Sequence, residues 1–175
     1  MSEYKQELVV VLDASAIFTG LPQYLPAKYV TTESVVNEIL DVHSRQVFEN
    51  LISANRVEVR PVSPVYKEKA IKKARDTGLS SKLSDTDIDL LALAMEIRDN
   101  VKNKVIVATD DYALQNILLL EGFYVLPTKT NGIRNTKKYK TICPACGYQG
   151  SSDERRCPVC GTPLIIVALR LNKKR

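Results

Sequence analysis

Two runs of apolar residues stand out in the hydrophobic pattern of the chain. The first begins at Val9 with Val-Val-Val-Leu and continues to Phe18 with one carboxylate, Asp13, inside it; the second is Val105–Ala108, Val-Ile-Val-Ala. A strand with one face in water alternates apolar and polar residues, whereas a strand buried on both faces is apolar throughout. Both runs therefore predict central strands of a parallel sheet.

Helical and strand-like patterns alternate along the rest of the first 127 residues. The expected helices cover 31–54, 84–100 and 111–120, further strands cover 56–60 and 123–126, and Gly20, Pro22 and Pro26 mark a loop over 19–28. Strands that alternate with helices favour a parallel sheet flanked by helices. The fold class that we expect is α/β.

The apolar pattern ends at Pro127, and the remaining chain divides into two parts. Residues 128–140 are polar and basic, which is typical of a flexible linker. Residues 141–175 hold two cysteine pairs, a strand-like stretch over 162–171 and a basic tail. We therefore expect an α/β domain over 1–127, a linker over 128–140 and a small second domain over 141–175.

The cysteines form two copies of one motif, Cys143-Pro-Ala-Cys146-Gly and Cys157-Pro-Val-Cys160-Gly. Each pair can turn two thiolates toward one metal ion, and the glycine that follows permits the turn. Four sulfur ligands fill a tetrahedral zinc site, so we expect a structural zinc ribbon whose folding energy comes from the metal. Iron and a pair of disulfides are the alternatives, and disulfides are disfavoured in a cytoplasmic chain.

The composition limits the compartment and the chemistry. With 175 residues, 45% of them hydrophobic, the chain can bury a sizeable core, and it has neither a long uncharged apolar segment nor a basic-then-apolar leader. We therefore expect a soluble, cytoplasmic protein without a membrane span. The single histidine, His43, stands in a polar stretch with no cysteine nearby, which argues against histidine-based acid–base catalysis and histidine metal sites.

The two parts of the chain carry opposite net charge. Residues 1–127 contain 14 Lys or Arg and 18 Asp or Glu, a net charge of −4, whereas residues 128–175 contain 11 and 2, a net charge of +9. An acidic body can hold cations, and a basic end can hold a polyanion such as nucleic acid. A basic end that is merely solvated is the alternative.

Several acidic residues occupy positions that a parallel sheet brings to one edge. Asp13 ends the first central strand, and Asp110 and Asp111 follow the second one after Thr109. Ligands of open parallel sheets bind at such strand ends. The simpler explanation for Asp13 is that it only caps the helix that follows.

Two helices each add an acid to this edge. Glu38 falls at the border of the apolar stripe of its helix, and Asp87 projects on the side of the next helix that carries Leu90. A carboxylate that faces inward needs a donor or a cation, because burying it alone is costly. Ser84, three residues before Asp87, predicts a capping box at the start of this helix, so capping is the simpler explanation for Asp87. Solvation is the simpler explanation for Glu38.

Taken together, these acids predict a metal site. Clustered carboxylates repel one another unless cations lie among them, and hard oxygen ligands suit Mg²⁺ or Mn²⁺. One or two such ions can activate water and stabilise in-line phosphoryl transfer. An acidic metal site with a basic appendage is therefore what we expect of a nuclease.

Four short motifs occur in the order found in PIN-domain ribonucleases. They are Leu-Asp-Ala-Ser at 12–15, Val-Xaa-Xaa-Glu-Ile at 35–39, Leu-Ser-Xaa-Xaa-Asp at 83–87 and Ala-Thr-Asp-Asp-Tyr at 108–112. With its cysteine ribbon, the chain resembles archaeal PIN-domain endonucleases that mature the 3′ end of small-subunit ribosomal RNA. The resemblance implies Mg²⁺- or Mn²⁺-dependent cleavage of an rRNA precursor that leaves a 5′ phosphate, with ribosome-assembly proteins as further partners.

The resemblance also implies roles for single residues. The acidic positions fall to Asp13, Glu38, Asp87 and Asp111, with Asp110 as the alternative for the last, and Ser15 and Thr109 support them. The basic residues expected to contact RNA lie before the third motif, in the linker and on the ribbon, where Tyr148 can stack on bases. They are Lys67, Lys69, Lys72, Lys73, Lys82, Lys137, Lys138, Arg155 and Arg156.

Two other functions remain open on the sequence. A toxin-type PIN ribonuclease that cuts tRNA or mRNA has similar chemistry, although the ribbon argues against it. A non-catalytic rRNA-binding assembly factor needs no metal site, so the complete set of acids argues against that interpretation. The lysine run before the third motif also has a simpler explanation as a solvated helix face.

Overall fold

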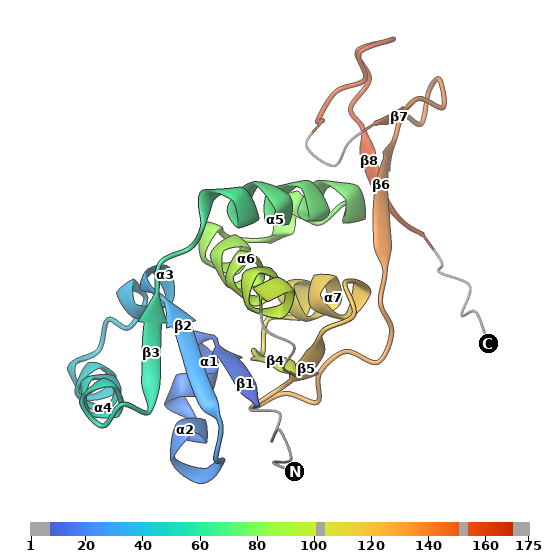
Figure 1. Ribbon diagram of the computed structural model, residues 1–175. Helices are drawn as coiled ribbons and strands as arrows, with labels where there is room; N and C mark the ends of the chain where they lie inside the picture. Colours follow the sequence, from blue (N-terminus) through green and yellow to red (C-terminus); the bar gives the residue numbers. More distant parts are fainter. Residues whose placement is uncertain (1–7, 101–103, 151–153, 170–175) are drawn as a thin grey trace, which may run out of the picture.

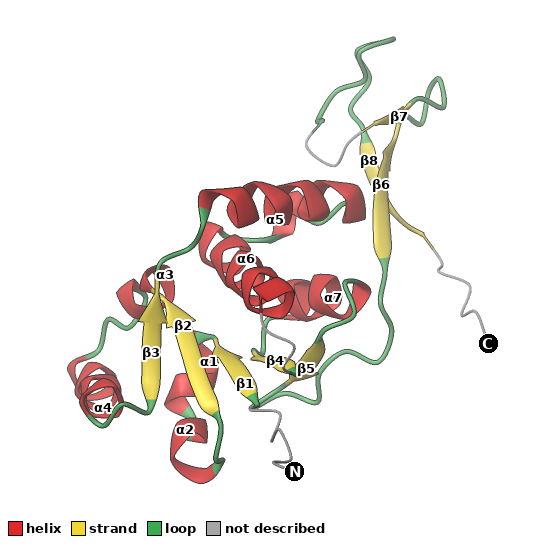
Figure 2. Cartoon of the chain, in the orientation of Figure 1, coloured by secondary structure: helices red, strands yellow, loops and turns green. Residues whose placement is uncertain are grey.

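A five-stranded parallel sheet forms the centre of the larger domain (Figures 1 and 2). The computed structural model describes residues 8–100, 104–150 and 154–169. The strands are β1 (Val9–Leu12), β2 (Lys28–Thr32), β3 (Val57–Arg60), β4 (Val105–Ala108) and β5 (Tyr124–Leu126), and their order is β3-β2-β1-β4-β5. The two apolar runs are the neighbouring strands β1 and β4, as predicted. The α/β fold class is confirmed.

Helices follow most of these strands. They are α1 (Ala14–Phe18), α2 (Leu21–Tyr24), α3 (Glu33–Asn37), α4 (Val42–Ser53), α5 (Pro64–Thr77), α6 (Asp85–Asn100) and α7 (Tyr112–Leu120), with a 3₁₀ turn, η1 (Ser80–Lys82), before α6. Of these, α6 packs on the sheet, and α5 packs on α6 (Figure 1). Among the described residues, no helix is long and apolar enough to cross a membrane.

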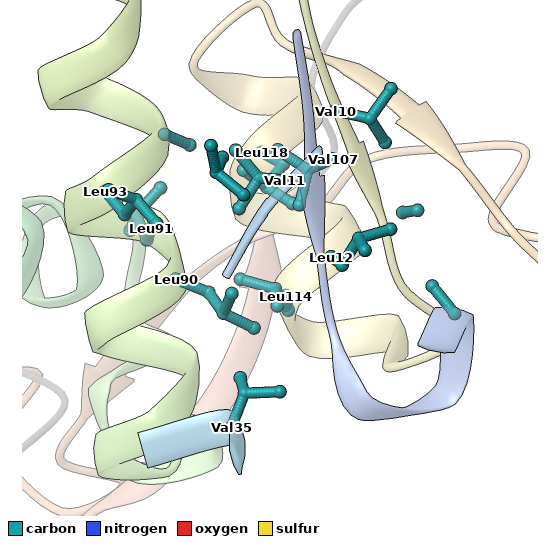
Figure 3. Close-up of a cluster of buried hydrophobic side chains, with 14 of the residues drawn as sticks. Val10, Val11, Leu12, Val35, Leu90, Leu91, Leu93, Val107, Leu114 and Leu118 are labelled. Atoms are coloured by element: carbon teal, nitrogen blue, oxygen red, sulfur yellow. The ribbon is translucent and has the colours of Figure 1, made fainter. Parts of the chain in front are cut away.

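Helix α6 lies at the centre of the hydrophobic core. Figure 3 shows Leu90 extending from α6 toward the side chains of β1, β4 and α7, and Leu90, Leu91 and Leu93 are each at most 1% exposed to solvent. Because α6 packs against both central strands, its first turn is held next to the strand ends that carry the acids.

Strand β2 corrects the expected loop and helix over 19–54. Residues 28–32 form this strand, and the expected long helix is two helices, α3 and α4, separated where Asp41 caps α4 by accepting a bond from Ser44 N at 2.8 Å. Thr31 donates its hydroxyl to the Leu12 carbonyl at 2.8 Å, so this buried polar side chain is hydrogen-bonded. The sequence of β2 contains Thr31 and Thr32, so it lacks the continuous apolar pattern that predicts a buried strand.

The C-terminal part forms a small antiparallel sheet of β6 (Lys138–Ile142), β7 (Gln149–Gly150) and β8 (Ile165–Leu169), in the order β7-β6-β8. Figure 1 shows β6 running from the side of α5 and α7 up to the ribbon. Tyr139 at the start of β6 packs against the core of the larger domain, and the Lys82 ammonium lies 4.0 Å from the centre of its ring. One strand therefore belongs to both domains.

Gly78 marks a close approach between the domains and gives a test of this contact. It ends α5 with φ of +73°, and a Cβ atom there would overlap the carbonyl group of Tyr139. We expect Gly78→Ala to lower the free energy of unfolding by about 1 kcal/mol for the left-handed backbone and by a further 1–3 kcal/mol, roughly, for the clash. Denaturant unfolding measures this loss.

Gly122→Ala is the matched control for Gly78→Ala. Gly122 also has a positive φ, +80°, but nothing lies within 4 Å of the position that a Cβ atom would take there. We therefore expect only the backbone cost of about 1 kcal/mol. Equal losses at the two positions would mean that β6 does not press against the end of α5.

Candidate active site and metal centre

Asp13 sits at the carboxyl end of β1, where it also caps α1. Its Oδ1 accepts the backbone N–H of Ala14 at 2.6 Å. Its Oδ2 accepts the Ser15 hydroxyl at 3.3 Å and the Thr109 hydroxyl at 2.7 Å. These bonds hold the carboxylate between the ends of β1 and β4, at the edge where ligands of parallel sheets bind.

Thr109 links the ends of these two strands. Its side chain is fully buried, and the hydroxyl that donates to Asp13 also accepts the backbone N–H of Asp111 at 3.1 Å. Ser15 makes a second, longer link, because its hydroxyl accepts the backbone N–H of Asp110 at 3.3 Å. Both residues expected to support the acids thus contact the acidic strand ends directly.

Asp87 and Asp111 each cap the helix that positions them. Ser84 donates its backbone N–H and its hydroxyl to Asp87 Oδ2, both at 2.8 Å, and its hydroxyl accepts the Asp87 N–H at 3.1 Å. This is the reciprocal capping box that the sequence predicted for the start of α6. Asp111 Oδ1 accepts the N–H of Leu114 at 2.7 Å. In both cases the capping bonds use one carboxylate oxygen.

Four of the predicted acids interact through their negative charges, which affects the pKa of Asp13 and of Asp87. Burial raises the pKa of Asp13, hydrogen bonds from Thr109, Ala14 and Ser15 oppose that rise, and the charge of Glu38 adds to it. Burial also raises the pKa of Asp87, where Ser84 opposes the rise and the charges of Asp111 and Asp13 add to it. Two strand ends and two helix ends therefore contribute carboxylates that repel one another.

Glu38 reaches this group from the end of α3. The helix stops at Asn37, so Glu38 is the residue that follows it, with an exposed side chain, and not a residue inside a longer helix. The negative charge of Glu38 contributes to the raised pKa of Asp13. That Glu38 joins the acids at the strand ends stays a prediction, and the long helix expected around it was wrong.

The Asp110 side chain binds the start of the linker. Its two oxygens accept the backbone N–H groups of residues 128–130 at 2.9–3.0 Å and the hydroxyls of Thr128 and Thr130. Burial alone raises the pKa of Asp110, but these hydrogen bonds outweigh it and hold the pKa well below its usual range. Of the two adjacent aspartates, Asp111 is the one whose charge acts on Asp87.

Two buried amides that the sequence pattern did not single out hold the segment that follows. Gln115 donates to the Thr109 carbonyl at 2.9 Å and accepts the N–H of Ile133 at 3.0 Å. Asn116 exchanges two bonds of 2.8 Å with the backbone of Lys137. These bonds fasten the expected flexible linker to α7. Adjacent amides inside an apolar helix were the available signal, because buried amides need partners.

The lysines expected to form a phosphate-binding face are mostly paired with acids. Lys67 lies 2.6 Å from Asp89, Lys69 lies 3.9 Å from Asp99, and Lys73 lies 2.9 Å from Glu121. These pairs tie α5 to α6 and to the end of α7. Lys72 on α5 and Lys137 are exposed, Lys138 is half-buried in β6, and Arg155 and Arg156 are exposed on the ribbon.

The cysteines lie together at the tip of the ribbon. Their four Sγ atoms are all within 4.8 Å of one another, with pairs at 3.5 and 3.7 Å, and no disulfide joins them. Sulfur atoms on a tetrahedral zinc ion, with Zn–S bonds of about 2.3 Å, lie about 3.8 Å apart. The geometry therefore fits a closed four-sulfur metal centre.

The two cysteine loops share one backbone pattern. In the first, Cys143 N donates to the Tyr148 carbonyl at 2.8 Å, and Gly147 N donates to the Cys143 carbonyl at 3.0 Å. The second repeats both bonds at 2.9 Å, from Cys157 to Thr162 and from Gly161 to Cys157. Among the described residues, this is the one group of metal-ligating side chains that already converges so closely. The carboxylates are spaced more widely, as like charges are without a cation.

A comparison with known protein families matches residues 10–97 to the PIN domain of ribonuclease. This range includes β1, α3 and α6 and therefore the acids Asp13, Glu38 and Asp87. The chain belongs to the PIN-domain ribonucleases. It is an endoribonuclease with a PIN domain and a C-terminal four-cysteine ribbon.

Individual relatives extend this likeness beyond the PIN domain. The chain is 38% identical to Endoribonuclease Nob1 of Archaeoglobus fulgidus over 95% of both chains. It is 32% identical to Endoribonuclease Nob1 of Pyrococcus abyssi over 94% of this chain and 96% of the relative. With Ribonuclease VapC3 of Aeropyrum pernix it shares 36% identity over 70% of this chain and 88% of the relative. The Nob1 likeness thus covers the ribbon as well as the PIN domain.

The ribbon geometry predicts the metal content of the protein. We expect about one zinc ion per chain after purification without added metal, because the site offers four sulfur ligands and no open position. Elemental analysis of the purified protein measures this, and Cys157→Ser should lower the zinc content. A protein that contains iron, or no metal, would contradict the assignment.

The hydrogen bonds at Asp13 predict how the site responds to pH. The Thr109 hydroxyl lowers the pKa of Asp13, so Thr109→Val should raise that pKa further above its ordinary value of 3.8. Only the ionised carboxylate can bind a cation, and it is lost as the pH falls through this pKa. If Asp13 is a metal ligand, Mn²⁺ binding should fail at a higher pH in the variant. Mn²⁺ titrations across pH and the ¹³C NMR signal of the Asp13 carboxyl measure the shift.

Ser15→Ala provides a graded comparison for Thr109→Val. Its hydroxyl bond to Asp13 is longer, 3.3 Å against 2.7 Å, and it contributes less to lowering the pKa. We therefore expect a smaller upward shift in the same direction. If the Asp13 pKa stays constant or falls in Thr109→Val, the buried hydroxyl does not stabilise the charged carboxylate.

Proposed function

We propose that the protein is a divalent-metal-dependent endoribonuclease that cleaves the precursor of small-subunit ribosomal RNA at its 3′ end. The observation that carries this proposal is the likeness to archaeal Nob1 endoribonucleases over nearly the whole chain, the ribbon included. The RNA substrate follows from the resemblance of the ordered motifs. The opposite charges of the PIN domain and of the linker and ribbon support a division of labour between cleavage and RNA binding.

Asp13, Glu38, Asp87 and Asp111 are the residues that we assign to the metal. Mutual repulsion and burial raise the pKa of Asp13 and Asp87, and a divalent cation among the four carboxylates relieves that repulsion. When bound, Mg²⁺ or Mn²⁺ supplies a water of lowered pKa and neutralises charge at the phosphate. Thr109 and Ser15 fix the orientation of Asp13 for this purpose.

Asp111 is a better fourth ligand than Asp110. Both oxygens of Asp110 are taken up by the backbone and hydroxyls of residues 128–130, whereas the capping bond of Asp111 uses Oδ1. The charge of Asp111 is also the one that acts on Asp87. We therefore assign Asp111 to the metal and Asp110 to the attachment of the linker.

A toxin-type ribonuclease that acts on tRNA or mRNA is the second candidate. The 36% identity to Ribonuclease VapC3 supports it, and the acidic site is chemically suited to either substrate. That likeness extends over 70% of the chain, against 95% for the Nob1 relative, and the four-cysteine ribbon carries the exposed Arg155 and Arg156. We therefore favour the rRNA precursor as substrate.

Cleavage of an RNA that spans the 3′ end of small-subunit rRNA, with and without Mn²⁺, tests the proposal. We expect the cut to require the ion and Asp87→Asn or Asp13→Asn to slow it at least about 100-fold, since even outer-shell partners of metal ligands cost 10–100-fold. The thermal stability of Asp87→Asn should equal or exceed that of the wild type, because the substitution removes a repelled, partly buried charge. Loss of cleavage then reflects the site and not misfolding.

Asp85→Asn is the matched control for Asp87→Asn. Asp85 lies in the same turn of α6, but its side chain is exposed, whereas Asp87 is partly buried. This variant should cut at the wild-type rate. Full Mn²⁺-dependent cleavage by Asp87→Asn would disprove the metal assignment, and preferred cutting of tRNA would favour the toxin-type alternative.

A further inference from the structure

A cavity of about 300 Å³ lies between the PIN-domain helices and the segment that leads into the ribbon. Its walls come from the 3₁₀ turn before α6, the first turn of α7 and the segment that leads into β6. Among the residues that line it are Lys82, Tyr112, Asn135, Lys137 and Tyr139. The volume is at the small end of the range for ligand pockets, about 300–1,000 Å³.

Two residues that line the cavity are close in sequence to the proposed metal ligands. Tyr112 directly follows Asp111, and Lys82 stands two residues before Ser84, which bonds Asp87. We therefore expect that, when the phosphate of a nucleotide strand reaches the acids, a neighbouring nucleotide lies near this cavity.

The outer wall of the cavity is held in place by buried groups. Residues 133 and 137 are bonded to Gln115 and Asn116, whose side chains are 1% and 5% exposed, at distances of 2.8–3.0 Å. Asp110 holds residues 128–130 in the same way. The cavity is thus formed before any ligand binds, which reduces the entropy cost of binding.

The lining has the chemistry of a site for a nucleobase. Tyr112 is 55% exposed, which leaves its ring accessible to a flat partner, and Asn135 is exposed beside it with an amide that can bond a base edge. Lys82 and Lys137 supply positive charge for flanking phosphates, and no acidic residue is among the described residues that line the cavity. Tyr139 is already covered by the Lys82 ammonium, so Tyr112 is the more accessible aromatic surface.

We propose that this cavity binds one unpaired base of the RNA next to the cleaved phosphodiester, with Tyr112 stacking on the base and Lys137 contacting its phosphate. The proposal rests on the ribonuclease function above and adds a substrate subsite to it. It requires single-stranded RNA at the cut, because a base in a duplex cannot enter a pocket. The linker is then part of the substrate site and not only a connection to the ribbon.

RNA oligonucleotides with an abasic residue at one position at a time test this subsite. The full chain with Asp13→Asn binds such RNAs without cutting them, and fluorescence anisotropy reports the affinity. We expect one abasic position near the cut to weaken binding about 5- to 100-fold, the effect of losing one stacked base. Adding Tyr112→Leu should weaken binding of the intact RNA by a similar factor and remove the extra effect of that abasic position.

Tyr124→Leu is the matched control, because Tyr124 is 57% exposed but lies on β5, outside the cavity. It should keep the abasic profile of the parent protein. Replacing Lys137 with Gln should flatten the dependence of log Kd on log salt concentration by about 0.7, the value for one phosphate contact on a single strand.

The outcomes separate the subsite from the proposed function. If no abasic position matters, or if Tyr112→Leu keeps the sensitive position, the subsite does not exist even where the wild type cuts the precursor. If the wild type cuts no precursor but Tyr112-dependent binding of one base is present, the subsite stands and the assigned substrate fails.

Discussion

The buried hydroxyl of Thr109 joins the two strand ends on which the site depends. It donates to Asp13 after β1 and accepts the backbone N–H of Asp111 after β4, and a hydroxyl can do both at once. Away from water such bonds are stronger, so they can hold carboxylates near one another against their repulsion. The apolar runs form the neighbouring strands β1 and β4, so the two strand ends lie side by side. The Thr109 hydroxyl then fixes the orientation of the Asp13 carboxylate and of the Asp111 backbone.

Helix capping and metal binding are compatible roles for the same acids. Asp13, Asp87 and Asp111 each accept a backbone N–H at or near the start of a helix, where the helix dipole also favours a negative charge. These contacts stabilise the charged form, yet the pKa of Asp13 and of Asp87 remains raised because burial and neighbouring charges outweigh them. The fold thus fixes these side chains in place and leaves a charge that a cation can neutralise.

Local patterns predicted the parts of the structure that depend on local physics. Continuous apolar runs gave β1 and β4, Ser84 with Asp87 gave the start of α6, and the repeated cysteine motif gave the ribbon. Strand β2 was missed because the hydroxyl of Thr31 is satisfied by a neighbouring strand, a tertiary contact that no local pattern contains. The choice between Asp110 and Asp111 likewise depends on where residues 128–130 lie.

The attachment of the linker to the PIN domain affects where the ribbon lies relative to the acidic site. A free tether would let the basic part of the chain sample many positions around the acidic site, at a cost in entropy whenever RNA bound both. Asp110, Gln115 and Asn116 instead bond the linker backbone at three places, and β6 starts at the residue after the last of them. Each of these side chains lies within six residues of Asp111, so the helix that carries a proposed metal ligand also sets the point from which the ribbon extends. If the ribbon holds RNA as we propose, this attachment presents the RNA to the acids from a fixed direction.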